Sequence, residues 1–227
     1  MRSRRRSKTS SRGTCELSTV TRRAYRAVPS AEMPITYLTF DDGPHAVHTP
    51  DLLDVLVRHD ARATFFQVGE DVERHPELTR RAAGEGHAVG NHSWSHPDLS
   101  QLGAAEGIEE LTRTTALLAD VLGRPPTLFR PPYGRMGPTT CADAASAGLA
   151  TALWDVSPED WSCPGADAIV ARVLEGIEDG AIVLFHDGGG DRSQTVAAVD
   201  ELLSVLRARG FEFHVLPAGG ETSQLRS

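Results

Sequence analysis

Residues 38–44 read LTFDDGP. The apolar run over residues 35–40 predicts a buried strand, which ends abruptly in two adjacent carboxylates and a Gly-Pro turn signal. Neighbouring residues on a regular strand point to opposite faces. Asp41 and Asp42 can therefore share one site only if the backbone is already turning, which Gly43 would permit. An isolated DDGP is most simply explained as a surface turn. Whether these aspartates form a functional site must therefore be judged from other segments of the chain.

The charge of the chain is unevenly distributed. Its 227 residues suffice for one large domain or two small ones, and the formal net charge is −8. Residues 1–33 hold nine Lys/Arg against two Glu, a net of +7, which leaves −15 on the remainder. An acidic folded part disfavours nucleic acid and polyanionic substrates and suits a neutral or cationic one.

The two ends of the chain have the composition of unfolded segments. Residues 1–33 are rich in Arg and Ser without an apolar face, so we predict a disordered basic segment, with a nucleic-acid-binding arm as the alternative. Arginines interrupt the only candidate apolar run, so we expect neither a signal peptide nor a membrane span, and the compartment stays open. Residues 218–227 are predicted to be a flexible tail, and residues 34–217 one domain.

Strand and helix patterns alternate along this domain. Seven strands alternating with helices predict a parallel sheet with helical crossovers, either open or closed into a barrel. Unusual polar residues follow the C-terminal ends of five strands, and those ends converge only at the mouth of a barrel. We therefore predict a single-domain, TIM-barrel-like α/β fold with seven strands. The predicted strands are 35–40, 63–68, 87–90, 127–130, 149–155, 181–185 and 211–216.

Six helices are predicted between these strands. Thr49 is predicted to cap the first, which continues through Leu56. The others are expected from residue 76 to 84 or 86, and over residues 104–122, 138–147, 166–177 and 194–209.

Residues 91–96 read NHSWSH and place two imidazoles four residues apart. On one helical turn His92 and His96 would lie on the same face, which is how a metal takes two nitrogens from one short segment. Such a pair alone is usually ordinary surface, but this one follows a strand end, as the aspartates do. Two His and one Asp describe a catalytic metal site, with Zn²⁺ expected and Co²⁺, Ni²⁺ or Mn²⁺ also compatible.

Five segments together resemble the ordered motifs of the NodB-type polysaccharide deacetylases, also called carbohydrate esterase family four. They are TFDDGP at 39–44, HSWSH at 92–96, RPPYG at 130–134, DW at 160–161 and LFHD at 184–187. One motif would be weak, but five in order over about residues 35–217 are specific. The resemblance implies a distorted (β/α)7 barrel, an acetylated glycan as partner, and metal-dependent removal of acetyl groups from amino sugars or, in some members, from xylan.

The resemblance also implies roles for the residues of these motifs. It makes Asp41 the general base and Asp42 a metal ligand beside His92 and His96. This division agrees with chemistry, because a carboxylate bound to a divalent cation is a poor base. Arg130 would hold Asp41 ionised through a charge-assisted hydrogen bond, although a surface arginine is the ordinary alternative.

The remaining motif residues would complete the site. The backbone N–H of Tyr133 would stabilise the oxyanion, and His186 would be the general acid, kept charged by Asp160. Trp161 and Leu184 would form the walls of the pocket for the acetyl methyl group. Taken separately, Leu184 is simply core and His186 a hydrogen-bonded strand-end histidine.

The predicted function is a metal-dependent hydrolase, expected to be monomeric, that removes acetyl from N-acetylglucosamine-containing glycans such as chitin oligomers or peptidoglycan. An acetylxylan esterase and an intracellular amide hydrolase for a small N-acyl metabolite are alternatives within the same chemistry. A catalytically silent glycan-binding barrel is the alternative from another class. Cys141 and Cys163 follow strand ends at the same rim, so a disulfide between them is a further hypothesis.

Overall fold

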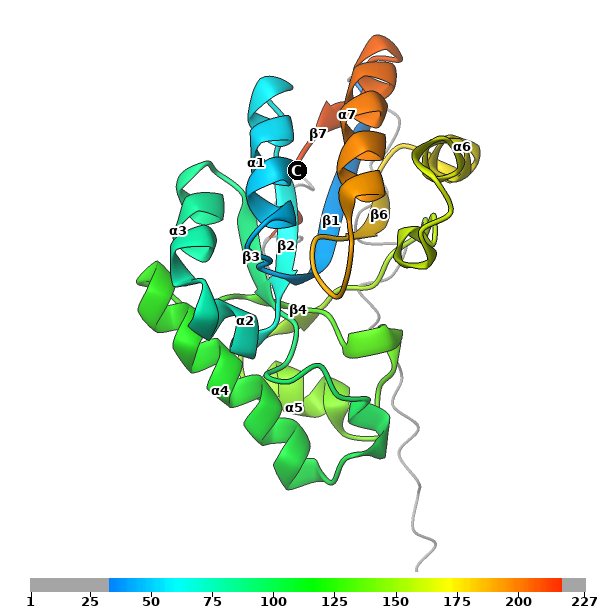
Figure 1. Cartoon of the computed structure of the whole chain (residues 1–227). Coiled ribbons are helices and arrows are strands. Elements are labelled where there is room, and N and C mark those ends of the chain that lie inside the picture. The colour runs from blue at the N-terminus through cyan, green and yellow to red at the C-terminus, as the bar shows by residue number, and fades with distance from the viewer. Residues whose placement is uncertain (1–32, 218–227) are drawn as a thin grey trace, which may run out of the picture.

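The computed structural model describes residues 33–217 (Figure 1). The predictions made for the basic N-terminal segment, apart from Met33, and for the tail at 218–227 fall on residues outside this range. Within the described range, no helix is both long and apolar enough to cross a membrane.

Within residues 33–217, seven parallel strands form one sheet in the order β5-β4-β3-β2-β1-β6, and β7 pairs with the first residues of β1. The alternation of strand and helix is thus a parallel sheet with helical crossovers, as predicted. The strands are β1 Ile35–Gly43, β2 Ala63–Gln67, β3 Ala88–Asn91, β4 Leu128–Phe129, β5 Ala150–Thr151, β6 Ala181–His186 and β7 Glu212–Phe213.

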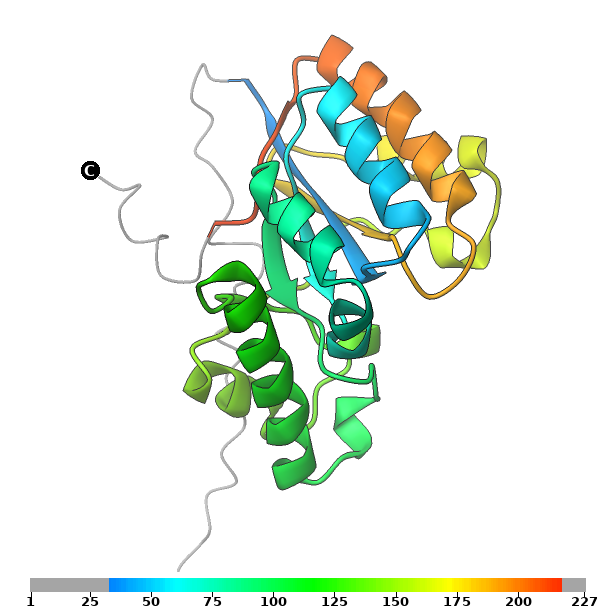
Figure 2. The same cartoon turned by 60° about the vertical axis from the view of Figure 1, so that its left-hand side comes forward.

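Seven α-helices connect the strands in the described part of the chain. Figures 1 and 2 show α1 and α7 side by side over β1, with α4 and α5 packed together at the β3–β4 end. One helix, α2, was not predicted, and its first N–H groups are bound by the carbonyls of Ser93 and Trp94 from another loop. The helices are α1 His48–Arg58, α2 Gly69–Arg74, α3 Pro76–Gly84, α4 Ala104–Leu122, α5 Thr140–Ser146, α6 Ala166–Gly176 and α7 Ser193–Ala208.

The gap between β5 and β6 is closed by the segment that follows β5. The N–H groups of Asp155 and Val156 donate to the carbonyl of Ile182, and Leu184 N–H donates to the carbonyl of Val156. This closure rests on one isolated parallel bridge, between Val156 and Val183, instead of a full strand pair. The fold is therefore the predicted distorted (β/α)7 barrel in a single domain, although β5 is much shorter than the expected strand 149–155.

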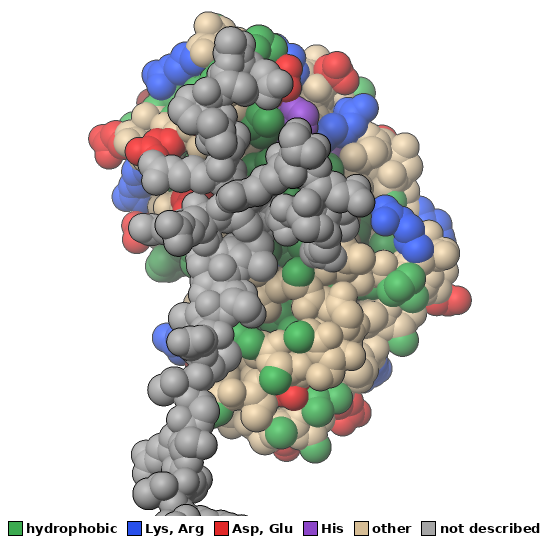
Figure 3. Space-filling view, turned by 180° about the vertical axis from the view of Figure 1, so that it is seen from behind, with side chains coloured by type: hydrophobic (Ala, Val, Ile, Leu, Met, Phe, Trp, Pro, Cys, Tyr) green, Lys and Arg blue, Asp and Glu red, His purple; other side chains and the backbone are tan. Residues whose placement is uncertain are grey.

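Two apolar layers hold this barrel together. Outside the sheet, Phe40 stacks between Phe65 and Phe185 at ring distances of 5.2 and 5.6 Å, beneath the helices. Inside, a smaller cluster including Phe66 and Ile182 fills the barrel. Burial of these rings drives the fold. Seen from behind, the lower part of the surface carries hydrophobic side chains scattered among backbone and other, uncharged side chains (Figure 3).

Candidate active site

The end of β1 brings two carboxylates to one side of the strand. Asp41 points into the barrel, while its neighbour Phe40 points to the helices. Asp42 then adopts a left-handed φ of 71°, and the register with β2 shifts between Asp41 and Gly43. The backbone turns at this point, as predicted, but Asp42 makes the turn and not Gly43.

Gly43 is required for a different reason. A Cβ atom at this position would collide with the carboxylate of Asp187, which lies directly behind the turn. Asp187 is buried, and its Oδ2 accepts a 2.6 Å hydrogen bond from the hydroxyl of Thr49. Thr49 is therefore not the cap of α1, which begins after Val47; its hydroxyl joins α1 to the loop after β6 instead. Burial raises the pKa of Asp187 to about 7.

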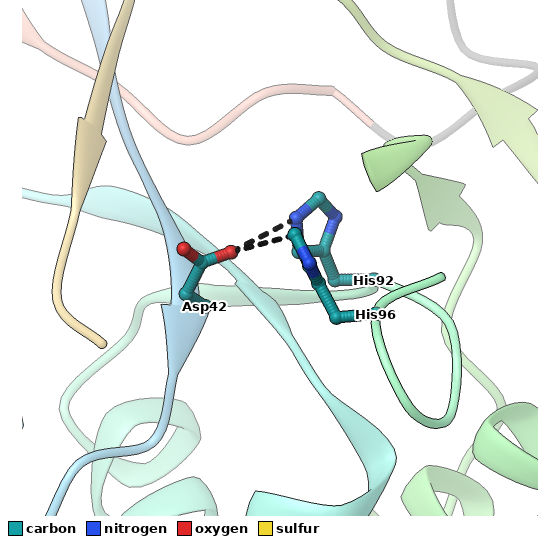
Figure 4. A group of neighbouring side chains, drawn as sticks. All are labelled: Asp42, His92 and His96. Carbon is teal, nitrogen blue, oxygen red and sulfur yellow. Dashed lines mark ion pairs between the residues drawn. The ribbon is translucent and has the colours of Figure 1, made fainter. Parts of the chain in front are cut away.

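Asp42, His92 and His96 form a cluster that could hold a metal ion (Figure 4). Asp42 Oδ1 lies 3.3 Å from His92 Nε2 and 3.0 Å from His96 Nε2. Both imidazoles point toward this oxygen from the loop after β3 (Figure 4). Burial by itself would raise the pKa of Asp42, but the hydrogen bonds with the two histidines outweigh it and hold the pKa well below its usual range. The cluster therefore offers an ionised carboxylate.

The hydrogen bonds around His92 suit a metal ligand. Its Nδ1 lies 2.7 Å from the carbonyl of Arg130, so Nδ1–H donates to that oxygen and Nε2 is aimed at Asp42, where a cation would replace the proton on Nε2. Two imidazole nitrogens and one carboxylate oxygen within 4.8 Å of one another are a donor set typical of catalytic zinc. The residues present thus fit a divalent cation.

The histidine loop is not the helical turn that the four-residue spacing predicted. Ser93 and His96 have positive φ values of 66° and 57°. Asn91 shapes the loop, since its Oδ1 accepts the N–H of Ser93 while its Nδ2 donates to the carbonyl of Leu111 on α4. Convergence of the imidazoles comes from this irregular backbone.

Glu110 on α4 gives the same loop a second anchor. Its carboxylate accepts the N–H groups of Trp94 and Ser95, each at 2.8 Å. Sequence reasoning missed both anchors. Asn91, directly before the first histidine, could have been noticed from its position, whereas no local pattern distinguishes Glu110 from the other acids of α4.

Arg130 is completely buried inside the barrel and is not a surface arginine. Its Nη1 donates to Asp41 Oδ1 at 2.8 Å and to Thr39 Oγ1 at 2.7 Å. Nε and Nη2 bind the carbonyls of Ala152 and Leu153. All three nitrogens of the guanidinium are thus hydrogen-bonded, which fixes the position of Asp41 Oδ1. Asp41 Oδ2 points toward the metal cluster and lies 3.7 Å from His92 Nε2.

His186, at the end of β6, is oriented by Asp160. The imidazole Nδ1 donates to Asp160 Oδ1 at 2.8 Å, and the backbone N–H of His186 donates to Asp160 Oδ2 at 2.9 Å. Thr195, which sequence reasoning missed, donates to the same Oδ2. Burial alone would lower the pKa of His186, but Asp160 raises it above its usual value.

Three further predicted residues lie around the mouth. Tyr133, in η2 (Pro132–Gly134), is 61% exposed and sets its ring edge-on to His96 at 4.7 Å. Trp161, in η3 (Asp160–Ser162), is 56% exposed. Leu184 is buried two residues after Ile182 and so shares its inward face.

The proposed disulfide between Cys141 and Cys163 is wrong. The Cys141 thiol lies 3.4 Å from the sulfur of Met136, while the Cys163 thiol contacts the carbonyl of Asp191 at 3.7 Å. Each thiol thus packs against its own surroundings, and the two segments do not bring the sulfur atoms together.

Several known proteins that this chain resembles in sequence and structure are deacetylases. The family model described as polysaccharide deacetylase matches residues 30–152. A chitooligosaccharide deacetylase of Bradyrhizobium sp. is 48% identical over 80% of this chain and 88% of its own. The peptidoglycan deacetylase PdaC of Bacillus subtilis has a solved structure that superposes with a TM-score of 0.78 and 35% identity, covering 87% of this chain and 95% of that one.

Structural similarity also extends to a family member described as inactive. A CE4 family pseudoenzyme from Bacillus anthracis superposes with a TM-score of 0.74 at 28% identity, covering 80% of this chain and 63% of that one. Fold alone therefore does not establish activity, and the site has to be judged on its residues. Family membership rests on the matched domain, the identity to relatives and the five motifs: the chain belongs to the polysaccharide deacetylase family, carbohydrate esterase family four.

Proposed function

We propose that the chain is a metal-dependent hydrolase that removes acetyl groups from N-acetylglucosamine units of an oligo- or polysaccharide and releases acetate. The observation that carries this proposal is the pairing of Asp41 with His186 across β1 and β6, beside the Asp42–His92–His96 cluster. A potential base, a potential acid and a cation site thus share one barrel mouth. All these groups come from one chain, so a monomer suffices.

Asp42, His92 and His96 would hold the cation, which we propose to be Zn²⁺, with Co²⁺, Ni²⁺ or Mn²⁺ as substitutes. When bound, such an ion polarises a carbonyl and makes water a stronger acid. The ionised state of Asp42 and the Nδ1–H bond of His92, which aims Nε2 at Asp42, prepare the chain for this ligand before it arrives.

The chain's own groups account for the proton transfers. Asp41 Oδ2 accepts a proton from the attacking water while Arg130 keeps Oδ1 in place. As the C–N bond breaks, the Nε2–H of charged His186 donates a proton to the departing nitrogen, because Nδ1 is already bound to Asp160. The amide and water thus become acetic acid and a free amine, and the backbone N–H of Tyr133 is proposed to stabilise the intermediate oxyanion.

Two features favour a glycan over a small metabolite. Tyr133 and Trp161 are exposed aromatic side chains that closely follow the site residues Arg130 and Asp160 in the sequence, and such rings offer flat surfaces to sugars. Relatives named for chitooligosaccharide and peptidoglycan act on polymers or oligomers of acetylated amino sugars. We propose that Trp161 and Leu184 bound the space for the acetyl methyl group.

Acetate release tests the proposal. The purified chain is incubated with chitin oligomers, peptidoglycan, acetylxylan and N-acetylglucosamine, with and without a chelator, followed by added Zn²⁺ or Co²⁺. We expect chelator-sensitive release from an N-acetylated oligomer or polymer. Release from acetylxylan alone would identify an esterase, and release from the monosaccharide alone a small-molecule amidase. Glycan binding without any release would identify a silent barrel and overturn the proposal.

A further inference from the structure

The loop after β6 carries three consecutive glycines, which we call the glycine loop (Gly188–Gly190). Its backbone lies directly against the proposed metal ligand Asp42. A Cβ atom on Gly188 would collide with the carbonyl of Asp42, and one on Gly189 would lie 2.7 Å from Asp42 Oδ2. Asp42 thus has Oδ1 facing the histidines and Oδ2 facing this loop. Any movement of the loop changes the surroundings of the carboxylate.

Arg192 holds the glycine loop from behind. Only 5% of the residue is exposed, and its Nε and Nη2 donate to the carbonyls of Gly188 at 2.7 Å and Gly189 at 3.1 Å. A Cβ atom on Gly189 would also lie 3.5 Å from Arg192 Nη2, so this glycine is contacted by both Arg192 and Asp42. The fork geometry of the guanidinium allows one side chain to fix two successive carbonyls.

The guanidinium of Arg192 has no carboxylate in direct contact. Within residues 33–217, Arg192 forms no salt bridge, its described hydrogen bonds go to backbone carbonyls, and the carboxylate of the neighbouring Asp191 interacts with its charge without a direct contact. Burying a cation without a direct salt bridge is costly, so a side chain in this position needs a compensating role. Holding the loop that supports an ionised metal ligand is such a role.

Arg192 also reaches the segment that orients His186. Its Nη1 donates to the carbonyl of Trp161 at 3.4 Å, next to Asp160. Two neighbours reinforce this junction, since Thr195 binds Asp160 and Gln194 accepts the N–H of Gly165. The start of α7 therefore joins both halves of the site, the metal ligand on β1 and the partner of His186 in η3.

We propose that Arg192 is a positioning residue of this active site. By binding the glycine loop and Trp161 together, it keeps Asp42 turned toward His92 and His96 and keeps η3 beside His186. The proposal rests on the metal site of the proposed function. It gives Arg192 no contact with substrate, and it assigns its effect to metal affinity and to turnover.

Two substitutions and one control test the proposal. R192K keeps the charge but loses the fork, and R192Q removes both. The control is R172Q, because Arg172 binds the carbonyl of Pro158 and the carboxylate of Glu159 on the same segment from its outer side. Zn²⁺ affinity is measured by competition with a chromophoric chelator on metal-free protein, together with kcat, KM and the melting temperature of each metal-free variant.

We expect R192Q to bind Zn²⁺ about 10- to 100-fold more weakly than the wild type, with R192K intermediate and R172Q unchanged. The kcat of the Zn²⁺-saturated R192 variants should fall while KM changes little. A lower melting temperature with Zn²⁺ affinity and kcat both within twofold of wild type would show a purely structural role and overturn the proposal. If R192Q does not fold, R192K decides by the same criteria.

This design separates the two proposals. Zn²⁺ affinity is measured without substrate, so its dependence on Arg192 is decided even if the wild type releases no acetate from any glycan. In that case the proposed function fails, and the Zn²⁺ affinities of the variants alone test whether Arg192 positions Asp42. Conversely, an active wild type with unchanged R192Q and R192K would refute only the role of Arg192.

Discussion

Asp41 and His186 are directly paired across the neighbouring parallel strands β1 and β6. Paired residues on parallel strands point to the same face, so the register of two central strands sets the relative position of the carboxylate and the imidazole. Arg130 then fixes one oxygen of Asp41, and Asp160 fixes one nitrogen of His186. The proposed proton acceptor and proton donor are thus held by rigid elements before substrate arrives.

Replacing Asp41 by Asn should abolish turnover without removing the cation. Asn keeps the shape of the side chain but cannot accept the proton of water, so kcat should fall by about 10²- to 10⁴-fold. Bound Zn²⁺ per chain, measured by atomic emission, should stay at one because Asp42, His92 and His96 are intact. A D41N variant within tenfold of wild-type kcat would remove Asp41 as the base.

Replacing Asp160 by Asn should change the pH dependence of kcat/KM. Asp160 raises the pKa of His186, so its loss lowers that pKa. His186 must be charged to act as an acid, and activity should then be lost at lower pH than in the wild type. The alkaline limb of the profile therefore moves toward lower pH. T195V is the control, because it leaves the charge of Asp160 in place, and it should shift the alkaline limb less. An alkaline limb that does not move in D160N would contradict the role of Asp160 in raising the pKa of His186.

Replacing His186 by Ala should harm amide hydrolysis more than hydrolysis of an activated ester. The nitrogen that leaves an amide needs a proton, whereas 4-nitrophenolate leaves without one. We expect kcat/KM for a chitin oligomer to fall by about 10²-fold or more, and that for 4-nitrophenyl acetate to fall much less. Equal losses on the two substrates would argue against proton donation by His186.

His87 should make the fold sensitive to acid independently of catalysis. It is buried immediately before the barrel strand β3, its Nδ1 accepts the N–H of Ala63, and burial lowers its pKa to about 4. The folded state binds this proton more weakly than the unfolded state, so stability is present above pH 6.5 and is lost as the pH falls toward 4.

Urea unfolding at pH 7 and pH 5 measures this loss. Between these pH values the wild type should lose about 2 kcal/mol more of its unfolding free energy than H87N, whose amide oxygen can still accept the N–H of Ala63. The same pH dependence in both proteins would show that His87 does not contribute to it.

Much of the fold and of the candidate site is readable from local sequence. The apolar run before Asp41 gives β1, alternating strand and helix patterns give the parallel barrel, and polar residues past strand ends mark the mouth. These features depend on side-chain patterns within a few residues. The long helix α4 was likewise predicted at its observed bounds, because its apolar spacing is regular and Gly123 ends it.

The parts that were missed depend on contacts between distant segments. The left-handed turn at Asp42 packs against the loop around Gly188, some 146 positions further on. The bent path from His92 to His96 depends on Glu110, and the burial of Arg130 depends on carbonyls that follow β5. Position in the sequence alone cannot reveal such distant partners. The four-residue spacing of His92 and His96, for example, fits a helical turn and an irregular loop equally well.

We propose that Asp42, His92 and His96 bind one divalent cation, and anomalous diffraction at the zinc edge from crystals grown with Zn²⁺ would locate it. We expect one strong peak at about 2.0–2.2 Å from Asp42 Oδ1, His92 Nε2 and His96 Nε2. A peak bound by other residues, or no peak at this cluster under saturating Zn²⁺, would contradict it.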